Sequence, residues 1–380
     1  MISSVQRYLN CLRILLSSVE GRRILFMKEF TLPPEKAARL SYDWLLNAQR
    51  ADGGLATWYV DSGWTSSYPE TTGYILPTLQ RSMQFFGQDR STEDSIEKAG
   101  NWLLSIQCKE GGWPGGYVHQ NRPPIVFNTG QVIRGMMSMY AYSKDERYLK
   151  AAVKASDWLV ALQDDRGFWE RSVYLDAVRV YDTYVAAPLA RLYTLTGDEK
   201  YRRSALRNTH WVSGEKQREN AWFEDADNTI AHNKRPILHT IAYTIDGMID
   251  TGVLLSDESS ISSAHKAASR LRDIFLESGK LHGRFDENWS GSEAFITTGG
   301  AQMAIIWQKL HKLLPDQSYD QAATKMMGKL LGLQVKNSDW PCQGAIFGSA
   351  PVWGRYEAFG CPNWASNTFS TACSFPLMIH

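Results

Sequence analysis

Five side chains in this 380-residue chain have the types and positions needed to move protons in a reaction. Each stands in, or at the end of, an aromatic-rich connection between two helix-like segments. Carboxyl, imidazole and phenol groups are the side chains that most often act as general acids and bases. Our candidates for catalysis are Glu70, Tyr181, Asp182, His239 and Glu293.

The same connections are rich in aromatic, amide and cationic side chains. Such a mixture suits a ligand that has apolar faces as well as polar groups, because aromatic rings cover the former and hydrogen-bonding groups fix the latter. The candidates for substrate binding are Trp64, Tyr68, Asn128, His232, Arg235, Trp289, Trp353 and Trp364.

Several of these residues also have a structural explanation. Glu70, Asn128 and Asp182 stand where helices should begin, and there Asn and Asp commonly cap the helix while Glu suits its positive end. His239 and Asp246 belong to an apolar helix, where a hydrogen-bonded core residue is the alternative. We favour function for His239, which begins its helix, and a structural role for Asp246, two turns deeper.

A repeated phrase sets the elements that position these groups. Trp-Leu-x-x-x-Gln, followed by glycine and tryptophan, occurs at 43–58, 101–113 and 157–169, with fainter copies at 210–222 and 332–340. By subtraction its glutamines, Gln49, Gln107, Gln163, Gln217 and Gln334, are 58, 56, 54 and 117 residues apart. The last gap spans two periods, so a degenerate copy should lie near residue 276. The sequence therefore predicts six repeats of one supersecondary unit.

Each repeat contains two helical patterns. The first has one charged and one apolar face and predicts outer helices; the second is almost free of charge and predicts buried inner helices, which small residues allow to pack closely. The outer segments are 35–49, 94–107, 149–163, 200–217, 262–277 and 319–334, and the inner segments are 70–79, 128–137, 182–190, 239–248, 297–306 and 364–373. Alternation of the two predicts an all-α fold, a single (α/α)6 toroid.

The connections indicate where function should be. Inner-to-outer links are short, whereas outer-to-inner links run about twenty residues, a length that is usually functional in a compact domain. The long links all fall at the end where the inner helices begin. We therefore place the active site at that end.

Bulk composition excludes several classes of protein. Hydrophobic residues make up 43% and charged residues 21%, as in ordinary globular proteins, and the net charge of +1 gives no reason to expect nucleic acid. Five cysteines without a CxxC pair predict free thiols. Charges interrupt the apolar run near Leu12, so we expect neither a signal peptide nor a transmembrane segment. We expect a cytoplasmic protein, with a periplasmic location left open, consisting of a helical extension at 1–30 packed on a toroid at 31–380.

The repeated phrase resembles that of the terpenoid cyclase and protein prenyltransferase toroids. The same double ring is used by glycoside hydrolases, alginate-lyase-like polysaccharide lyases and glucuronyl C5-epimerases. The phrases Glu70-Thr-Thr-Gly-Tyr-Ile, His239-Thr-Ile-Ala-Tyr and Pro362-Asn-Trp-Ala resemble toroid proteins associated with bacterial polysaccharide biosynthesis. The resemblance implies the fold, but a fold alone does not determine the chemistry.

The isoprenoid branch of this resemblance would require motifs that the sequence lacks. Neither Asp-x-Asp-Asp nor Asp-Asp-x-x-Asp occurs, and the phrase 238–243 has no Asp-x-Cys partner that could complete a zinc site. No motif requires a metal or other cofactor. We therefore expect a carbohydrate-active enzyme with a glycan substrate, and keep isoprenoid chemistry or a non-catalytic glycan-binding toroid as alternatives.

Two mechanisms remain open within the carbohydrate class. Glycoside hydrolysis needs two carboxyl groups, for which Glu70, Asp182, Asp227 and Glu293 are available. Lyase or C5-epimerase chemistry needs a base, a proton donor and a group that holds a sugar carboxylate. His239, Tyr181, Tyr243, His232, Arg235 and Asn128 suit those roles, and the charges between 225 and 239 favour an acidic sugar.

Overall fold

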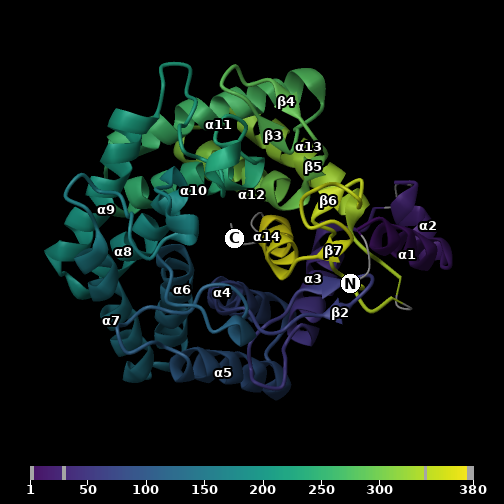
Figure 1. The fold of residues 1–380 in the computed structure, drawn as a ribbon, viewed down its shortest axis with the longest axis horizontal. Helices are drawn as coiled ribbons and strands as arrows, with labels where there is room; N and C mark the ends of the chain where they lie inside the picture. Colours follow the sequence, from purple (N-terminus) through teal and green to yellow (C-terminus); the bar gives the residue numbers. More distant parts are fainter. Residues whose placement is uncertain (1–3, 28–30, 338–339, 375–380) are drawn as a thin grey trace.

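The computed structural model of the chain describes residues 4–27, 31–337 and 340–374. Within these residues, helices alternate along the chain between an outer and an inner ring (Figure 1), which confirms the predicted (α/α)6 toroid. The outer helices are α3 (Pro34–Asn47), α5 (Arg90–Ser105), α7 (Glu146–Leu162), α9 (Glu199–Trp211), α11 (Glu258–Ser278) and α13 (Gln317–Leu333). The inner helices are α4 (Pro69–Phe86), α6 (Val126–Ser143), α8 (Thr183–Thr196), α10 (Leu238–Leu255), α12 (Thr297–Leu313) and α14 (Asn363–Ser374).

Burial separates the two rings as the sequence patterns predicted. The outer helix α9 buries one face, with Tyr201, Ala205 and Trp211 inside, whereas α10 is buried along almost its whole length. Each inner helix packs on the next, and α14 closes the ring against α4 and α3. Figure 1 shows α14 beside the centre of the ring.

Glycines permit this close packing of inner helices. A Cβ atom on Gly73 would lie 2.5 Å from Cα of Val132, and one on Gly247 would lie 2.3 Å from the carbonyl carbon of Thr183. Both distances are too short for any side chain. The pairs α4–α6 and α8–α10 therefore require glycine at these positions.

The repeated glutamines tie each repeat to the next. The side-chain amide of Gln107 donates to the carbonyl of Gly111 in its own turn (2.8 Å) and to that of Ala151 on the following outer helix (2.9 Å). Gln334 does the same at the end of the chain, where its amide donates to Ala37 on the first outer helix (2.8 Å). The glutamine is thus a joint between repeats, and its last copy closes the outer ring.

The repeated tryptophans fill the space behind these turns. Trp113 and Trp169 are fully buried, and their indole nitrogens donate to the carbonyls of Leu103 (2.8 Å) and Leu159 (2.9 Å). They are structural, as the repeat predicted. The repeated phrase therefore helps to position the long connections.

Short strands occur in the long connections and nowhere else among the described residues. Strands β1 (Trp58–Tyr59), β2 (Gly63–Trp64) and β7 (Gly360–Cys361) form an antiparallel sheet in the order β2-β1-β7, joining the first connection to the last. The other antiparallel pairs are β3 (Arg284–Phe285) with β4 (Gly291–Ser292), and β5 (Phe295–Ile296) with β6 (Ser349–Ala350). Single 3-10 turns lie at Val118–Gln120, Tyr174–Asp176, Val180–Asp182 and Ile230–His232, and a π-helical turn lies at Val212–Lys216.

Two N-terminal helices, α1 (Ser4–Leu16) and α2 (Val19–Leu25), lie outside the double ring (Figure 1). Arg7 pairs with Asp61 in the first long connection (2.6 Å), and the indole of Trp340 donates to Ser18 (2.8 Å). The predicted boundary at residue 30 falls outside the described residues, so the division into extension and toroid stays a prediction. No helix in the described ranges has the length and apolar character to cross a membrane. All five cysteines are free thiols.

Candidate active site

Glu70 begins the inner helix α4 and is buried at the end of the ring where the long connections lie. The hydroxyl of Tyr68 donates to Oε2 of Glu70 (2.8 Å). Burial raises the pKa of Glu70 to about 7, against the lowering effect of this hydrogen bond. Glu70 is therefore a carboxylic acid that keeps its proton at mildly acidic pH and can donate it.

His239 occupies the first turn of α10, which lies across the ring from α4, with α6 and α8 between them on one side and α12 and α14 on the other. Its Nδ1–H donates to Oε1 of Gln302 on α12 (2.8 Å). Burial lowers the pKa of His239 to about 4, so the ring is neutral near pH 7. With Nδ1 carrying the proton, Nε2 has a free lone pair and can act as a base.

A continuous set of aromatic contacts joins these two groups. The indole nitrogen of Trp364 donates to the hydroxyl of Tyr356 (2.8 Å), and the Tyr356 ring lies 5.6 Å from His239 between centroids. Trp364 also meets Tyr68, the partner of Glu70, edge to face at 6.2 Å. Residues from α4, α10, α14 and the last connection thus form one cluster, which we call the Glu70–His239 cluster.

Tyr243 extends the cluster toward α6 and α8. Its ring lies 4.4 Å from His239, 5.2 Å from Phe127 and 4.5 Å from Tyr184. Phe127 in turn meets Tyr181 edge to face at 5.1 Å. Through these contacts the predicted residue Tyr181 belongs to the same cluster.

Asp182 and Asn128 begin α8 and α6 with buried polar atoms that lack a partner. Within the described residues, Oδ2 of Asp182 and Nδ2 of Asn128 make no hydrogen bond. Asp182 is the N-cap of α8 but makes no side-chain capping bond, and Asn128 is not the N-cap of α6. Glu70 lies in the first turn of α4, where a carboxylate suits the positive end of the helix, so this structural explanation stays open for Glu70. Burial raises the pKa of Asp182 to about 8, despite the opposing charge of Arg179. Unpaired buried polar groups are costly, which makes these atoms candidates for binding a polar ligand.

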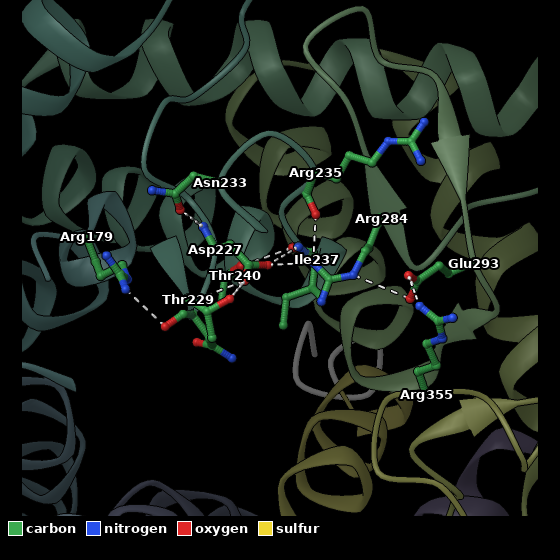
Figure 2. A network of polar contacts seen from close by, with 11 residues as sticks. Arg179, Asp227, Thr229, Asn233, Arg235, Ile237, Thr240, Arg284, Glu293 and Arg355 are labelled. Carbon is green, nitrogen blue, oxygen red and sulfur yellow. Dashed lines mark hydrogen bonds and ion pairs between the residues drawn. The ribbon is translucent and has the colours of Figure 1, made fainter. Parts of the chain in front are cut away.

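Asp227 and Glu293 belong to a different arrangement (Figure 2). The carboxylate of Asp227 accepts hydrogen bonds from Nη1 of Arg284 (2.8 Å), from the backbone of Ile237 (3.0 Å) and from both donors of Thr229. Arg284 also faces Glu293 (3.4 Å). We call this set, completed by the exposed Arg355 at 3.4 Å from Glu293, the Asp227–Arg284 network.

The remaining predicted residues contact other parts of the molecule. Trp64 packs on Trp44 (5.5 Å), beneath the guanidinium of Arg50 (4.5 Å), and Trp289 is buried with its indole donating to the Asn220 carbonyl (2.9 Å). The exposed predicted residues are Trp353, His232 and Arg235. The structure does not bring these residues into the Glu70–His239 cluster. Their role in substrate binding stays a prediction.

Sequence reasoning did not select Gln302 or Glu357, and it left Tyr356 and Tyr243 outside the chosen set. No local signal marks Gln302, which is one polar residue in an apolar inner helix. Tyr356 precedes the phrase 362–365, but its contact with His239 depends on the path of the last connection. Asp246, given a structural role, forms an ion pair with Lys309 (2.6 Å), as that role requires.

No group of three or more His, Cys, Asp or Glu side chains within residues 4–27, 31–337 and 340–374 is arranged to hold a metal ion. The cluster at the end of the ring contains instead a buried carboxyl group, Glu70, and a neutral imidazole, His239, which are connected through phenol and indole side chains. Such groups transfer protons and bind hydroxyl groups.

Comparison with solved structures supports the fold. A heparin-specific unsaturated glucuronyl hydrolase has a TM-score of 0.70 at 15% identity, over 91% of this chain and 98% of that chain. A sugar epimerase from a ruminal bacterium has a TM-score of 0.69 at 14% identity, over 89% and 98%. Cellobiose 2-epimerase from Bacillus thermoamylovorans has a TM-score of 0.69 at 8% identity, over 87% and 95%.

Comparison with sequence families identifies the chain itself. No curated protein matches it. A family model described as the β-L-arabinofuranosidase GH127 catalytic domain matches residues 45–274, which is more than half of the 380 residues. The chain therefore belongs to the family of the β-L-arabinofuranosidase GH127 catalytic domain, and it is an enzyme that acts on carbohydrates.

Proposed function

We propose that this protein hydrolyses the glycosidic bond of a short glycan, with Glu70 as the general acid and His239 as the general base. One observation carries the proposal: burial raises the pKa of Glu70 to about 7 and lowers that of His239 to about 4. Between these values the acid holds its proton and the base is free of one. Environments that push two pKa values apart in this way are typical of acid–base pairs.

The hydrogen bonds assign the reacting atoms. Tyr68 donates to Oε2 of Glu70, so the acidic proton sits on Oε1 and passes from there to the glycosidic oxygen. Gln302 holds His239 with its proton on Nδ1, so Nε2 takes a proton from water. The water oxygen forms a bond to the anomeric carbon as the bond to the leaving sugar breaks. Proton release from His239 and proton uptake by Glu70 then restore the starting state.

The groups around Glu70 and His239 would bind the sugar. Asn128 and Asp182 offer unpaired polar atoms to sugar hydroxyls, and Tyr181 lies beside them. Trp364 and Tyr68 supply apolar ring surface, which suits the apolar face of a sugar. These roles would give Oδ2 of Asp182 and Nδ2 of Asn128 the hydrogen-bond partners that the described residues do not supply.

A second candidate function is epimerisation or elimination on a uronic acid. The observation that favours it is the position of His239 between the phenols Tyr243 and Tyr356, because an imidazole and a phenol can remove and return a proton at carbon. The charges between 225 and 239 give it less support, since Asp225 pairs with Lys216 (2.8 Å) and Asp227 with Arg284. Asn128 remains available to hold a sugar carboxylate.

The test is incubation of the protein with a panel of glycans. The panel contains β-L-arabinofuranosides, unsaturated glucuronyl disaccharides, cellobiose and uronate oligosaccharides. New reducing ends, absent with Glu70→Gln, would support hydrolysis. Deuterium uptake at carbon or a new double bond, without reducing ends, would replace it with the second candidate. Silence in all three measurements from folded protein would count against catalysis by this cluster.

A further inference from the structure

Glu357 lies in the connection between β6 and β7, next to Tyr356 of the Glu70–His239 cluster. The hydroxyl of Tyr59, on β1, donates to Oε2 of Glu357. Burial raises the pKa of this carboxyl group. Among the described residues, no hydrogen bond is made to the other oxygen, Oε1, and the residue is only partly buried.

A series of direct contacts connects Glu357 to the proposed general acid. Tyr59 and Tyr117 are near enough for the hydroxyl of Tyr59 to influence the pKa of Tyr117, and the Tyr117 ring lies 5.2 Å from that of Tyr68, which donates to Glu70. Two carboxyl groups, each held by a tyrosine hydroxyl, therefore flank one pair of packed tyrosine rings. Tyr117 is half-buried, so part of its ring remains accessible.

The backbone at Glu357 adopts a conformation that is uncommon for a residue with a side chain. The connection is already anchored by the pairing of β7 with β1, in which Tyr59 stands opposite Gly360. Glu357 nevertheless has a φ of 49°, and Phe359 a φ of 58°, a left-handed conformation that is unfavourable for such residues. Strain of this kind concentrates at functional sites.

The N-terminal helix α1 packs against the residues around the contact between Tyr59 and Glu357. Arg7 pairs with Asp61 and lies over the Tyr59 ring (5.7 Å), while Tyr8 packs edge to face on Phe359 (5.1 Å). Both sides of the contact between Tyr59 and Glu357 are therefore braced. A braced carboxyl group with one free oxygen is pre-organised for binding.

We propose that Glu357, Tyr59 and Tyr117 form a second sugar-binding subsite beside the Glu70–His239 pair, so that the substrate carries at least two sugar residues. Glu357 accepts hydrogen bonds from hydroxyls of the second sugar, and Tyr117 covers part of its apolar face. The inference rests on the proposed carbohydrate function of the cluster. It deepens that proposal by naming the residues that bind the second sugar of the short glycan, and it predicts weaker binding of a simple monoglycoside.

The experiment compares binding of two probes by titration calorimetry, in a Glu70→Gln background that prevents turnover. The probes are a β-L-arabinofuranosyl disaccharide and methyl β-L-arabinofuranoside, or the corresponding pair for whichever panel sugar the wild-type protein processes. Glu357→Gln should weaken disaccharide binding about 10- to 100-fold, as expected for a lost hydrogen bond to a charged group. It should change binding of the methyl glycoside less than about twofold. Glu277→Gln, on the exposed face of α11, is the matched control and should change neither.

Tyr59→Phe is a second test in case Glu357→Gln does not fold. It keeps the ring that packs on Gly360 and removes only the hydroxyl. It should weaken disaccharide binding alone, about 3- to 10-fold, as expected for one neutral hydrogen bond. Equal loss for both probes, or no loss for either, would overturn the subsite while leaving the hydrolase proposal intact. Failure of the wild-type protein to bind or process any panel sugar would overturn both.

Discussion

Two carboxyl-bearing regions lie at the same end of this toroid and differ in one respect. Asp182, in the Glu70–His239 cluster, is 2% exposed, and Asp227, in the Asp227–Arg284 network, is 1% exposed. Asp227 receives hydrogen bonds from a guanidinium, a hydroxyl and backbone amides, whereas Oδ2 of Asp182 receives none from the described residues. The two carboxyl groups are therefore equally buried, and they differ in the number of hydrogen-bond donors that reach them.

The difference has an energetic meaning. A buried carboxylate that is fully hydrogen-bonded and paired is stable as an anion and contributes to folding. A buried carboxyl group without donors keeps its proton and costs stability as the pH rises. The first arrangement holds a connection in place, and in the function proposed above the second keeps an acid protonated for a substrate. Substitutions in the two regions should therefore have different effects.

The largest expected effect is on catalysis by Glu70. Glu70→Gln keeps the shape and the hydrogen bond from Tyr68 but cannot give up a proton, so kcat should fall about 10²- to 10⁴-fold, the range of a lost general acid. Steady-state kinetics on the active panel sugar measures this, with Glu277→Gln as control. A variant that keeps more than a tenth of the wild-type rate would remove Glu70 from the role of acid.

Asp227→Ala should act on folding instead. It leaves the Arg284 guanidinium, which is largely buried, without its partner, and should lower the free energy of unfolding by about 3 kcal/mol. Urea denaturation measures the loss, and the exposed Asp165→Ala is the control. Activity per folded molecule should stay near wild type. A fall in that activity at unchanged stability would show that the two regions share the chemistry.

The pH dependence of kcat/KM should report the Glu70–His239 pair. Protonation of His239 should produce an acidic limb near pH 4, and ionisation of Glu70 an alkaline limb near pH 7. Each limb should change about tenfold per pH unit, because one proton is involved. His239→Gln should abolish the acidic limb in whatever activity remains. Identical pH limbs in wild type and His239→Gln would exclude the imidazole as the base.

Stability should respond to pH through Asp182. The folded protein holds the Asp182 proton to about pH 8, whereas an unfolded chain releases it near pH 4. The unfolded state therefore binds fewer protons between these values, and the free energy of unfolding should fall as the pH rises from about 4 to about 8. Asp182→Asn should flatten this fall and be more stable than wild type at pH 8. Parallel curves for both proteins, from urea denaturation across this range, would mean that Asp182 finds a partner when it ionises.

The sequence was sufficient for the fold because its signal is repeated and local. Gln107 and its copies mark the joints, and the uncharged segments mark the buried helices. The site was only partly predictable for the opposite reason. His239 could be chosen from its place at the start of an inner helix, but its contact with Gln302 joins residues 63 positions apart, and that of Tyr59 with Glu357 joins residues 298 apart. Local patterns carry no information about such contacts.

Glu293 shows most clearly how far the sequence can predict the site. Substitution of Glu293 should also have the smallest effect. In sequence Glu293 resembles Glu70, since both carboxyl groups stand where a long connection leads into an inner helix. In the structure Glu293 lies 3.4 Å from Arg284 and 3.4 Å from Arg355, whose side chain is 86% exposed. Solvent screens such pairs, so Glu293→Gln should cost less than about 1 kcal/mol of stability. Urea denaturation measures the stability of this variant, and steady-state kinetics measures its activity. The activity should stay within about threefold of wild type, because no proton transfer is assigned to Glu293. A hundredfold loss of activity at unchanged stability would move Glu293 into the reaction, and the supply of donors would then no longer distinguish a structural carboxylate from a catalytic one.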